Sequence, residues 1–315
     1  MTTATIVDNA DDWDSISSHL VLWPLEQCHA YGEAARSIGQ VPLRLRVDVA
    51  GERVQAQFLL RRAARFLSLA QSIRGPVATS WHTGVGHAAL AALFDGLPRR
   101  WPALTLAMPE ATSGSDTDAL LRPLGYRRVI SPYRTALLDL RSDPDALRRR
   151  MWPAWRNRLA VGLKSRLRTR SASSGPLIDW VLSNSLAEMR RRRVRGPSLP
   201  FAQALTGALG ARRVLAVTAS DDEGSCAGAI FLKHGPDATY WLSLTTERGR
   251  RKHAGNLVLW QAIETLQRTG TRMLDLGGID TDRAPGIARF KLGLGAEPHS
   301  LSGTYAESGF RLGGT

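Results

Sequence analysis

The stretch from residue 273 to residue 296 constrains the fold more than any other part of the sequence. It begins with a short apolar run, residues 273–276, of the kind that forms a buried strand. Gly277-Gly278 ends this run and allows backbone angles and close approaches that a side chain would block. Pro285-Gly286 marks a second turn, and Arg289-Phe290-Lys291 then places two cations around an aromatic ring. The pattern predicts a buried strand, a tight turn and a charged segment, held in place by the rest of the chain.

Lys291 is the most informative cation in this stretch. Only four of the 42 basic side chains are lysine, at positions 164, 233, 252 and 291, and the other 38 are arginine. A lysine ammonium is a compact point charge whose pKa can shift on burial, which arginine cannot do. Lys291 is therefore a candidate catalytic residue. The alternative is a solvated charge after a strand, because unpaired charges are mostly exposed.

Length and composition limit the class of protein. With 315 residues the chain has room for two domains, and its hydrophobic content of 43% is that of an ordinary globular protein. No apolar window is long enough for a transmembrane helix, and the N-terminus has no secretory pattern. Cys28 and Cys226 are far apart, and no Cys or His pair has metal-ligand spacing. We therefore expect a cytoplasmic protein with neither a disulfide framework nor a metal site.

The net charge of +14 is concentrated in one segment. Residues 148–195 contain 14 basic side chains against Asp179 and Glu188, a balance of +12. A focus of this size favours a polyanionic partner, such as nucleic acid, nucleotide phosphates or an anionic lipid surface. The alternative is a solvated helix face that keeps the protein soluble.

Two tryptophans lie in this basic segment. Trp152 and Trp155 are interleaved with arginines that include Arg156, an arrangement that suits base stacking and phosphate contacts. Tryptophans three residues apart are also typical of core anchors covered by arginine stems, and we favour that interpretation for both rings. The arginines, Arg156 among them, stay candidates for donor binding.

The order of elements predicts a mixed α/β (α+β) fold. Residues 42–49 alternate apolar and polar side chains and are expected to form a hairpin with residues 54–60. A boundary before the helix cap at Asp143 divides the chain into domains 1–142 and 143–315. In the second domain we expect three helices, at residues 151–167, 176–194 and 199–209, followed by three antiparallel strands, at 214–219, 227–233 and 239–244. A helix at 255–268 and a strand at 271–276 come next.

A basic turn precedes the helix expected at 255–268. A helix N-terminus with free N–H groups binds phosphate well, and flanking cations strengthen such a site. Arg250, Lys252 and Gly255 are therefore candidates for donor or phosphate binding. The alternative is a basic turn with an N-terminal cap.

The C-terminal motif resembles that of a known family. Residues 274–280 read Leu-Asp-Leu-Gly-Gly-Ile-Asp, and residues 285–291 read Pro-Gly-Ile-Ala-Arg-Phe-Lys. With Gly-Leu-Gly-Ala at 293–296 and Ser-Gly-Thr-Tyr at 302–305, they are similar to the signature of the Fem-type (FemABX) aminoacyltransferases. The resemblance implies two tandem acetyltransferase-like (GNAT) domains, each with a mixed, mostly antiparallel sheet flanked by helices.

The resemblance also implies roles for individual residues. Phe290 and Lys291 match a pair at the family's transfer centre, where Phe290 would shape the channel and Lys291 would stabilise the charge that develops on the ester carbonyl. Arg36 is the nearest match to a family lysine that contacts a phosphate of the acceptor. The other candidates for substrate binding are Arg193, Tyr240, Asp280 and Arg289.

The basic turn departs from the pattern that ordinary acetyltransferases use for coenzyme A. They grip its pyrophosphate with Arg/Gln-x-x-Gly-x-Gly/Ala, whereas this chain keeps Arg250 and Gly255 and has His253 at the central position. A side chain there would crowd a pyrophosphate. We expect an anion site that is not standard for coenzyme A.

The leading hypothesis is an acyltransferase that moves an aminoacyl group from aminoacyl-tRNA to an amine of a peptidoglycan-precursor-like or other small acceptor. Such a reaction needs no metal and no cofactor besides the tRNA co-substrate, and contact with a membrane surface stays open. The alternative is an N-acyltransferase that uses acyl-CoA or another thioester. A third hypothesis is a non-catalytic module that binds nucleic acid or an anionic surface.

Overall fold

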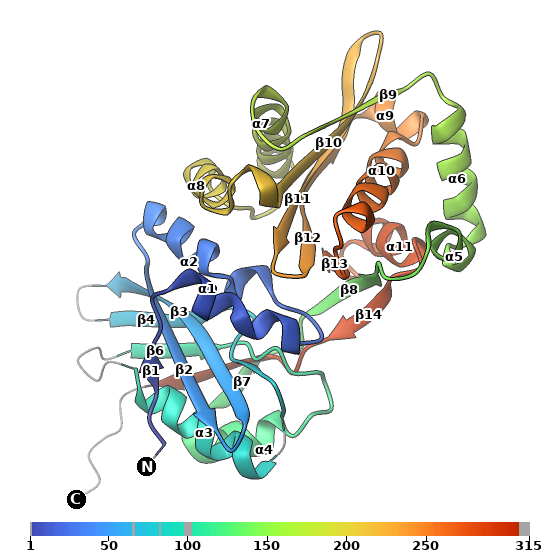
Figure 1. Cartoon of the computed structure of the whole chain (residues 1–315). Helices are drawn as coiled ribbons and strands as arrows, with labels where there is room; N and C mark the ends of the chain where they lie inside the picture. The colour runs from blue at the N-terminus through green and yellow to red at the C-terminus, as the bar shows by residue number, and fades with distance from the viewer. Residues whose placement is uncertain (1, 65–66, 82, 98–102, 309–315) are drawn as a thin grey trace, which may run out of the picture. The chain divides into compact units, whose positions relative to one another are not determined.

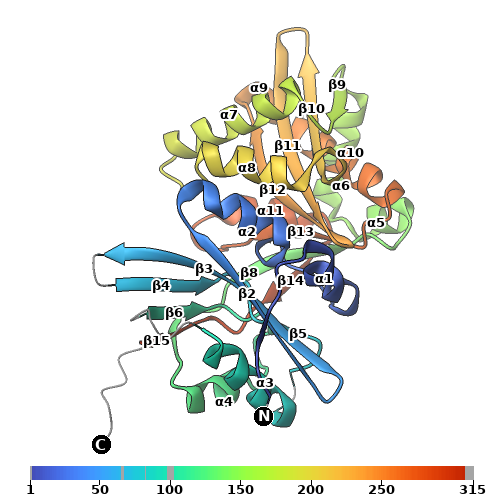
Figure 2. The same ribbon diagram turned by 60° about the vertical axis from the view of Figure 1, so that its left-hand side comes forward.

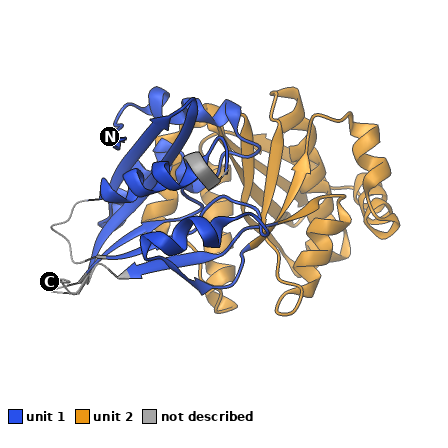
Figure 3. Ribbon diagram, turned by 90° about the horizontal axis from the view of Figure 1, so that it is seen from below, with its two compact units in different colours: residues 1–133, 300–315 blue, residues 134–299 orange. Residues whose placement is uncertain are grey.

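The computed structural model describes residues 2–64, 67–81, 83–97 and 103–308 (Figure 1). The chain forms two compact units, residues 1–133 with 300–315 and residues 134–299 (Figure 3). The second unit thus begins a few residues before the expected boundary, and the last strand belongs by its contacts to the first unit.

The first unit is organised around a mixed sheet, in which eight strands lie within the described residues. Its order is β1-β2-β3-β4-β6-β15-β7, with β5 beside β3, and β4 and β6 are parallel. The strands are β1 Thr5–Ile6, β2 Val41–Val49, β3 Glu52–Ala64, β4 Leu67–Ser72, β5 Val77–Ala78, β6 Ala103–Ala107, β7 Arg127–Ile130 and β15 Thr304–Ser308. The helices are α1 Ala10–Asp14, α2 His29–Ala35, α3 Thr83–Asp95 and α4 Thr117–Leu121.

The predicted hairpin is confirmed as β2 and β3, which pair with Val47 opposite Val54. The alternation predicted it because every second side chain of a half-buried strand faces the core. Leu45 and Val47 are buried there together with Leu90 and Leu93 of α3.

The second unit has a mixed sheet of the order β14-β8-β13-β12-β11-β10-β9. The strands are β8 Arg134–Asp139, β9 Arg168–Ala172, β10 Val214–Asp221, β11 Gly224–His234, β12 Asp237–Thr245, β13 Met273–Gly278 and β14 Glu297–Ser300. The helices are α5 Pro144–Arg150, α6 Pro153–Lys164, α7 Pro176–Arg191, α8 Leu199–Leu209, α9 Glu247–Arg251, α10 Ala254–Arg268 and α11 Pro285–Gly293. Helices α7 and α8 lie on one face of this sheet and α10 on the other (Figures 1 and 2).

The helices and central strands of this unit lie close to their predicted positions, but β9 and β14 were not predicted. β9 reads Arg-Thr-Arg-Ser-Ala and is an edge strand, so it lacks the apolar pattern of a buried one. Its sequence matches the charged edge that protects a sheet from pairing with another chain.

The two sheets share one topological feature. In the first, the parallel pair β4–β6 is followed by β15 and then β7, and in the second the parallel pair β12–β13 is followed by β8 and then β14. β7 and β8 are consecutive in the chain but belong to different sheets, as do β14 and β15. The strand next to the parallel pair is β15 in the first sheet and β8 in the second. Each of these two strands directly follows, in the chain, a strand of the other sheet.

Strands β12 and β13 are paired over only part of their length. Their register joins Asp237–Thr239 to Met273–Asp275, although β12 continues to Thr245 and β13 to Gly278. A bulge at Trp241 on β12 interrupts the opposite ladder, because Ile230 and Phe231 of β11 face Leu242 and Tyr240. Bulges bend a strand and re-aim its side chains. The parallel ladder accordingly ends just before Tyr240 on β12 and before Gly277 on β13.

Candidate active site

Lys291 lies beside the end of this parallel ladder. Pro285 occupies the first turn of α11, where proline is tolerated, and Lys291 occupies the last turn. The Lys291 side chain is buried, with 9% of its surface exposed, and its Nζ donates a hydrogen bond of 2.8 Å to the carbonyl oxygen of Gly278. The structure thus places the ammonium against the glycine pair.

The backbone of the glycine pair is shaped by Asp275. Gly277 has a φ of +75°, and its N–H donates a 2.7 Å hydrogen bond to Oδ1 of Asp275. The hydroxyl of Thr135, on β8, donates a hydrogen bond to the same oxygen. A Cβ at position 277 would lie 3.6 Å from the Lys291 Nζ, so the absence of a side chain leaves room beside the ammonium. Asp275 therefore fixes the strand end against which Lys291 rests.

Burial changes the acidity of Lys291. Desolvation lowers its pKa from 10.5 to about 8, and the nearby charge of Asp275 partly opposes this shift. At neutral pH the group is still mostly protonated. It is a fixed, poorly solvated cation that can stabilise an oxyanion.

Phe290 packs beside Trp155. The two ring centroids are 5.9 Å apart, and Trp155 Nε1 donates a 2.9 Å hydrogen bond to the carbonyl oxygen of Phe290. Phe290 is half-buried against the core of the second unit. This packing orients the last turns of α11 and hence Lys291.

The two tryptophans of the basic segment differ in their surroundings. Trp155 is 2% exposed and belongs to the core, as predicted. Trp152 is 48% exposed, so the expectation that it too is a core anchor was wrong. The reason is its place: it caps the start of α6, while Trp155 lies on the buried face of that helix.

Tyr240 lies on β12 just past the end of the parallel ladder. Its ring is half-buried against Phe231, with centroids 5.3 Å apart, and burial raises the pKa of its hydroxyl. A Cβ at Gly277 would lie 3.9 Å from the Tyr240 carbonyl oxygen, so this backbone adjoins the glycine pair. The structure brings Tyr240 and Lys291 to the same strand end.

Asp280 and Arg289 flank the buried site. The exposed carboxylate of Asp280 accepts hydrogen bonds from the N–H groups of Asp282 (3.0 Å) and Arg283 (2.8 Å), and the bond from Arg283 is the main reason its pKa is lowered. Asp280 thus stabilises the turn into α11. Arg289 is exposed on that helix.

Arg193 and Arg36 belong to other parts of the fold. Arg193 follows α7, on the sheet face opposite α10, and is exposed with a φ of +55°. Arg36 lies in the first unit, where its Nε forms a 2.9 Å ion pair with Glu33. Their roles in acceptor binding stay predictions.

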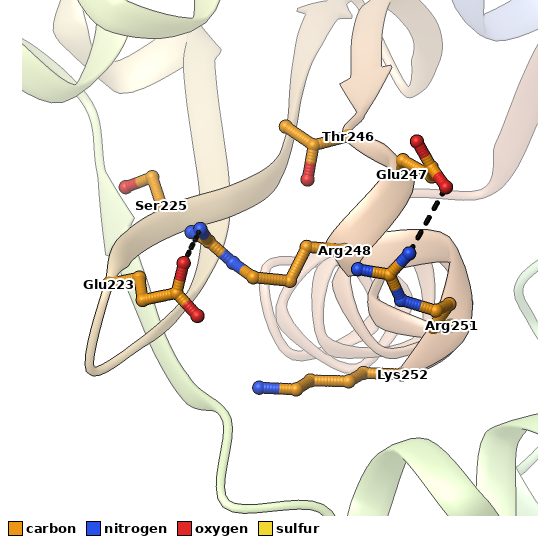
Figure 4. A pocket seen from close by; sticks show the side chains of 7 residues that line it. All are labelled: Glu223, Ser225, Thr246, Glu247, Arg248, Arg251 and Lys252. Atoms are coloured by element: carbon orange, nitrogen blue, oxygen red, sulfur yellow. Dashed lines mark hydrogen bonds and ion pairs between the residues drawn. The ribbon is translucent and has the colours of Figure 1, made fainter.

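The predicted phosphate site lies beside a cavity of about 640 Å³ (Figure 4). Asp221 Oδ2 lies 2.7 Å from Lys252 Nζ and 3.0 Å from Arg248 Nε. Arg248 also pairs with Glu223 at 2.8 Å, and Arg251 with Glu247 at 3.1 Å. The cations of this cavity are therefore compensated by carboxylates. The lining residues are Glu223, Ser225, Thr246, Glu247, Arg248, Arg251 and Lys252.

The turn itself has little room for a further group. Arg250 donates a 2.8 Å hydrogen bond to the carbonyl oxygen of Thr245. His253, with a φ of +52°, adopts the left-handed conformation that glycine adopts most readily, and its N–H donates to the carbonyl oxygen of Arg250 at 3.2 Å. A Cβ at Gly255 would come within 2.9 Å of Thr245 Oγ1, so this glycine is needed for packing. Arg156 lies exposed on α6.

Sequence reasoning missed Asp275 and Thr135 as parts of this site. The signal for Asp275 was present, because a carboxylate within the apolar run Met-Leu-Asp-Leu is a buried charge that needs partners. Thr135 carried no such signal. It reaches Asp275 only because β8 and β13 are neighbours in the sheet.

The described residues show neither a metal cluster nor a membrane-spanning helix. No group of three or more His, Cys, Asp or Glu side chains is placed to hold a metal ion there. Among the same residues, no helix combines the length and hydropathy that crossing a bilayer requires.

Comparison with known proteins defines the class. Residues 146–299 match the family described as an acetyltransferase (GNAT) domain, whereas no curated protein matches the sequence. Residues 146–299 of the second unit are therefore a GNAT domain, and the chain is an acyltransferase.

The fold of the whole chain resembles particular members of this class. It matches the crystal structure of FemX with a TM-score of 0.81 over 96% of both chains, at 14% identity. It matches a tandem GNAT protein from the clavulanic acid biosynthesis pathway with a TM-score of 0.60 over 100% of both chains, at 16% identity. A domain from Agrobacterium fabrum, assigned as part of a lysylphosphatidylglycerol synthetase, matches at 0.50 over 88% of this chain and 86% of that one, at 14% identity. The predicted tandem GNAT fold is thus confirmed, and the likeness to FemX is a likeness of fold.

Proposed function

We propose that the protein transfers an aminoacyl group from aminoacyl-tRNA to the amine of a small acceptor, at the site around Lys291. One observation carries the proposal: a buried ammonium, held by the Gly278 carbonyl, lies where two parallel strands separate. In open α/β sheets, ligands bind in the crevice outside the carboxyl ends of parallel strands, which is where this ammonium lies.

The chemistry suits these groups. The acceptor amine attacks the ester carbonyl carbon, and a C–N bond forms as the carbonyl oxygen becomes negative. Collapse breaks the bond to the ribose oxygen, which leaves with a proton, while the amine nitrogen loses one. The Lys291 ammonium offsets the transient negative charge, an effect worth about 3 kcal/mol for one well-placed donor.

Three features support tRNA as the donor. The Fem-type resemblance of residues 274–305 implies it, and the balance of +12 in residues 148–195 suits a polyanion. In addition, the cations beside α10 are paired with Asp221, Glu223 and Glu247, which weakens the case for a coenzyme A pyrophosphate there. The acceptor would be a peptidoglycan precursor or a similar molecule, bound with the help of Arg36, Arg193, Tyr240, Asp280 and Arg289.

In this proposal the enzyme acts in the cytoplasm and needs no metal or cofactor besides its co-substrate. Arg156, Arg250, Lys252 and Gly255 would contact the donor. Contact with a membrane surface would bring the enzyme to a membrane-bound acceptor.

A second candidate is transfer from acyl-CoA. Arg250 and Gly255 keep two positions of the coenzyme A pattern at the start of a long helix, and the clavulanic acid tandem GNAT protein is described by reference to acetyl-CoA. Substitution of His253 by glycine would strengthen coenzyme A binding under this reading.

The test is a transfer assay with a pool of labelled aminoacyl-tRNAs and a cell extract that supplies acceptors. We expect label in a small, ribonuclease-resistant product with the wild type, none with Lys291→Ala, and partial activity with Lys291→Arg, which keeps the charge. Consumption of acyl-CoA without transfer from tRNA would instead favour the second candidate. Wild-type turnover by a folded Lys291→Ala variant would remove Lys291 from the mechanism.

A further inference from the structure

Trp152, at the start of α6, has an exposed aromatic ring that packs against α11, the helix that carries Lys291. The backbone N–H of Trp152 donates a 2.9 Å hydrogen bond to the carbonyl oxygen of Gly293, at the end of α11. A Cβ at Gly293 would lie 3.5 Å from the Trp152 ring, so the ring packs directly on the backbone of α11. Nearly half of its surface, 48%, is nevertheless exposed. A large ring held in place but open to solvent is a surface suited to stacking.

Two unpaired cations accompany this ring. Arg156 is one turn further along α6, where its N–H donates to the Trp152 carbonyl oxygen at 3.0 Å. Arg289 is four residues before Gly293 on α11 and so lies on the same side of that helix. Both are exposed, and within the part of the chain that the structure describes neither forms a salt bridge. They differ in this from Arg248 and Lys252, which are paired with Asp221.

We propose that Trp152, with Arg156 and Arg289, binds the single-stranded 3′ end of the tRNA donor by stacking on one base and contacting the adjacent phosphates. This inference rests on the proposed function and assigns a place to its donor. Stacking on an aromatic ring tolerates any base, and cations alongside hold the backbone.

Helix geometry specifies which nucleotide stacks there. Lys291 and Gly293 are two residues apart on α11, so their directions differ by about 200° around the helix axis. Trp152 therefore lies across α11 from the ammonium, about one helix diameter away, or roughly 10 Å. The stacked base therefore belongs to a nucleotide upstream of the terminal one, whose ester lies at Lys291.

The test measures RNA binding directly. A fluorescein-labelled RNA minihelix with an unpaired CCA end and the same minihelix with a blunt end are titrated with wild type, Trp152→Ala, Trp152→Phe and Val161→Ala. Val161 is the matched control, since it is exposed on the outer side of the same helix. Circular dichroism establishes that each variant is folded.

We expect the wild type to prefer the CCA-ended RNA. Trp152→Ala should lower affinity for it about tenfold, within the range for loss of one stacked base, while the blunt minihelix is unaffected. Trp152→Phe should keep most of the affinity and Val161→Ala all of it. Arg156→Ala should make the slope of log affinity against log salt concentration shallower by about one phosphate contact.

Two results would overturn the inference. One is equal binding of the CCA-ended RNA by wild type and Trp152→Ala. The other is that Trp152→Ala instead abolishes sedimentation with phosphatidylglycerol vesicles, which would make the ring a membrane contact. A transfer assay separates this inference from the proposed function. If the function holds and Trp152 stacks, Trp152→Ala raises the KM for aminoacyl-tRNA and leaves kcat near the wild type; absence of transfer by the wild type refutes the function itself.

Discussion

Lys291 shows how burial changes an ordinary cation. Its pKa falls from 10.5 in the unfolded chain to about 8 in the folded protein, chiefly because the ammonium is desolvated. Below pH 8 both states carry the proton, and burial of the charge destabilises the fold. Between pH 8 and 10.5 the unfolded chain binds more protons, so the free energy of unfolding rises with pH. Above 10.5 the destabilisation is gone.

We therefore predict a pH-dependent effect of Lys291→Met. The variant removes the buried charge, so its stability relative to the wild type should be greatest below pH 8 and should fall by roughly 3 kcal/mol as pH rises to 10.5. Loss of the hydrogen bond to Gly278 adds an offset that does not depend on this titration. Urea unfolding of both proteins at pH 7 and at pH 10 measures the change. A difference that is the same at both values would mean that Lys291 titrates normally.

At the scale of elements, the active site depends on the C-terminal end of β13. Asp275 accepts the N–H of Gly277 and so holds this strand end, where Gly277 has a φ of +75°. The chain offers a matched comparison in Gly270, which has a φ of +74° but would have nothing within 4 Å of an added Cβ.

Substitution of these two glycines by alanine should separate strain from function. Each change forces an L-residue into the left-handed region at a cost of roughly 1 kcal/mol, so both variants should lose similar stability. Only Gly277→Ala places a methyl group 3.6 Å from Lys291 Nζ, where the reacting carbonyl must fit, and we expect it to lose roughly tenfold or more in kcat. Thermal unfolding and transfer kinetics on both variants test this. Equal activity would show that substrate does not approach from this side.

At the scale of the whole molecule, the connections between strands tie distant parts of the chain together. β15, near the C-terminus, lies between β6 and β7 of the first unit. Its Tyr305 is buried, and the Tyr305 hydroxyl donates a 2.7 Å hydrogen bond to Asp118. The N-terminal unit therefore depends on residues that follow the active-site motif.

Truncation after Ser302 should unfold the first unit. It removes β15 and exposes the apolar surface around Tyr305, and loss of one buried aromatic alone costs about 3 to 5 kcal/mol. Hydrogen exchange of the β6 amides should lose its protection, whereas truncation after Ser308, which keeps β15, should leave it unchanged. Full protection in the shorter chain would show that β6 and β7 can be held without this strand.

Much of the fold followed from the sequence alone, and Lys291 as a candidate catalytic residue was also proposed from it. The strand expected at 271–276 lies at Met273–Gly278 and includes the glycine pair that was expected to end it. Local patterns suffice to place such a strand approximately, because periodicity acts over neighbouring residues. The hairpin β2–β3 and helices α8 and α10 were predictable for the same reason. The charged edge strand β9 was not, since its place in the sheet comes from its neighbour β10 and not from its own pattern.

The tertiary structure decided what depends on residues far apart in the chain. Burial of Lys291 and its lowered pKa arise only when α11 packs against the end of β13, and the bond between Thr135 and Asp275 forms only when β8 pairs with β13. The same holds for Trp152 and Trp155, which share a sequence pattern but differ in exposure because only one faces the core. The sequence determined which groups were available. Packing determined which of them became desolvated, and desolvation is what turns a charge into a reactive group.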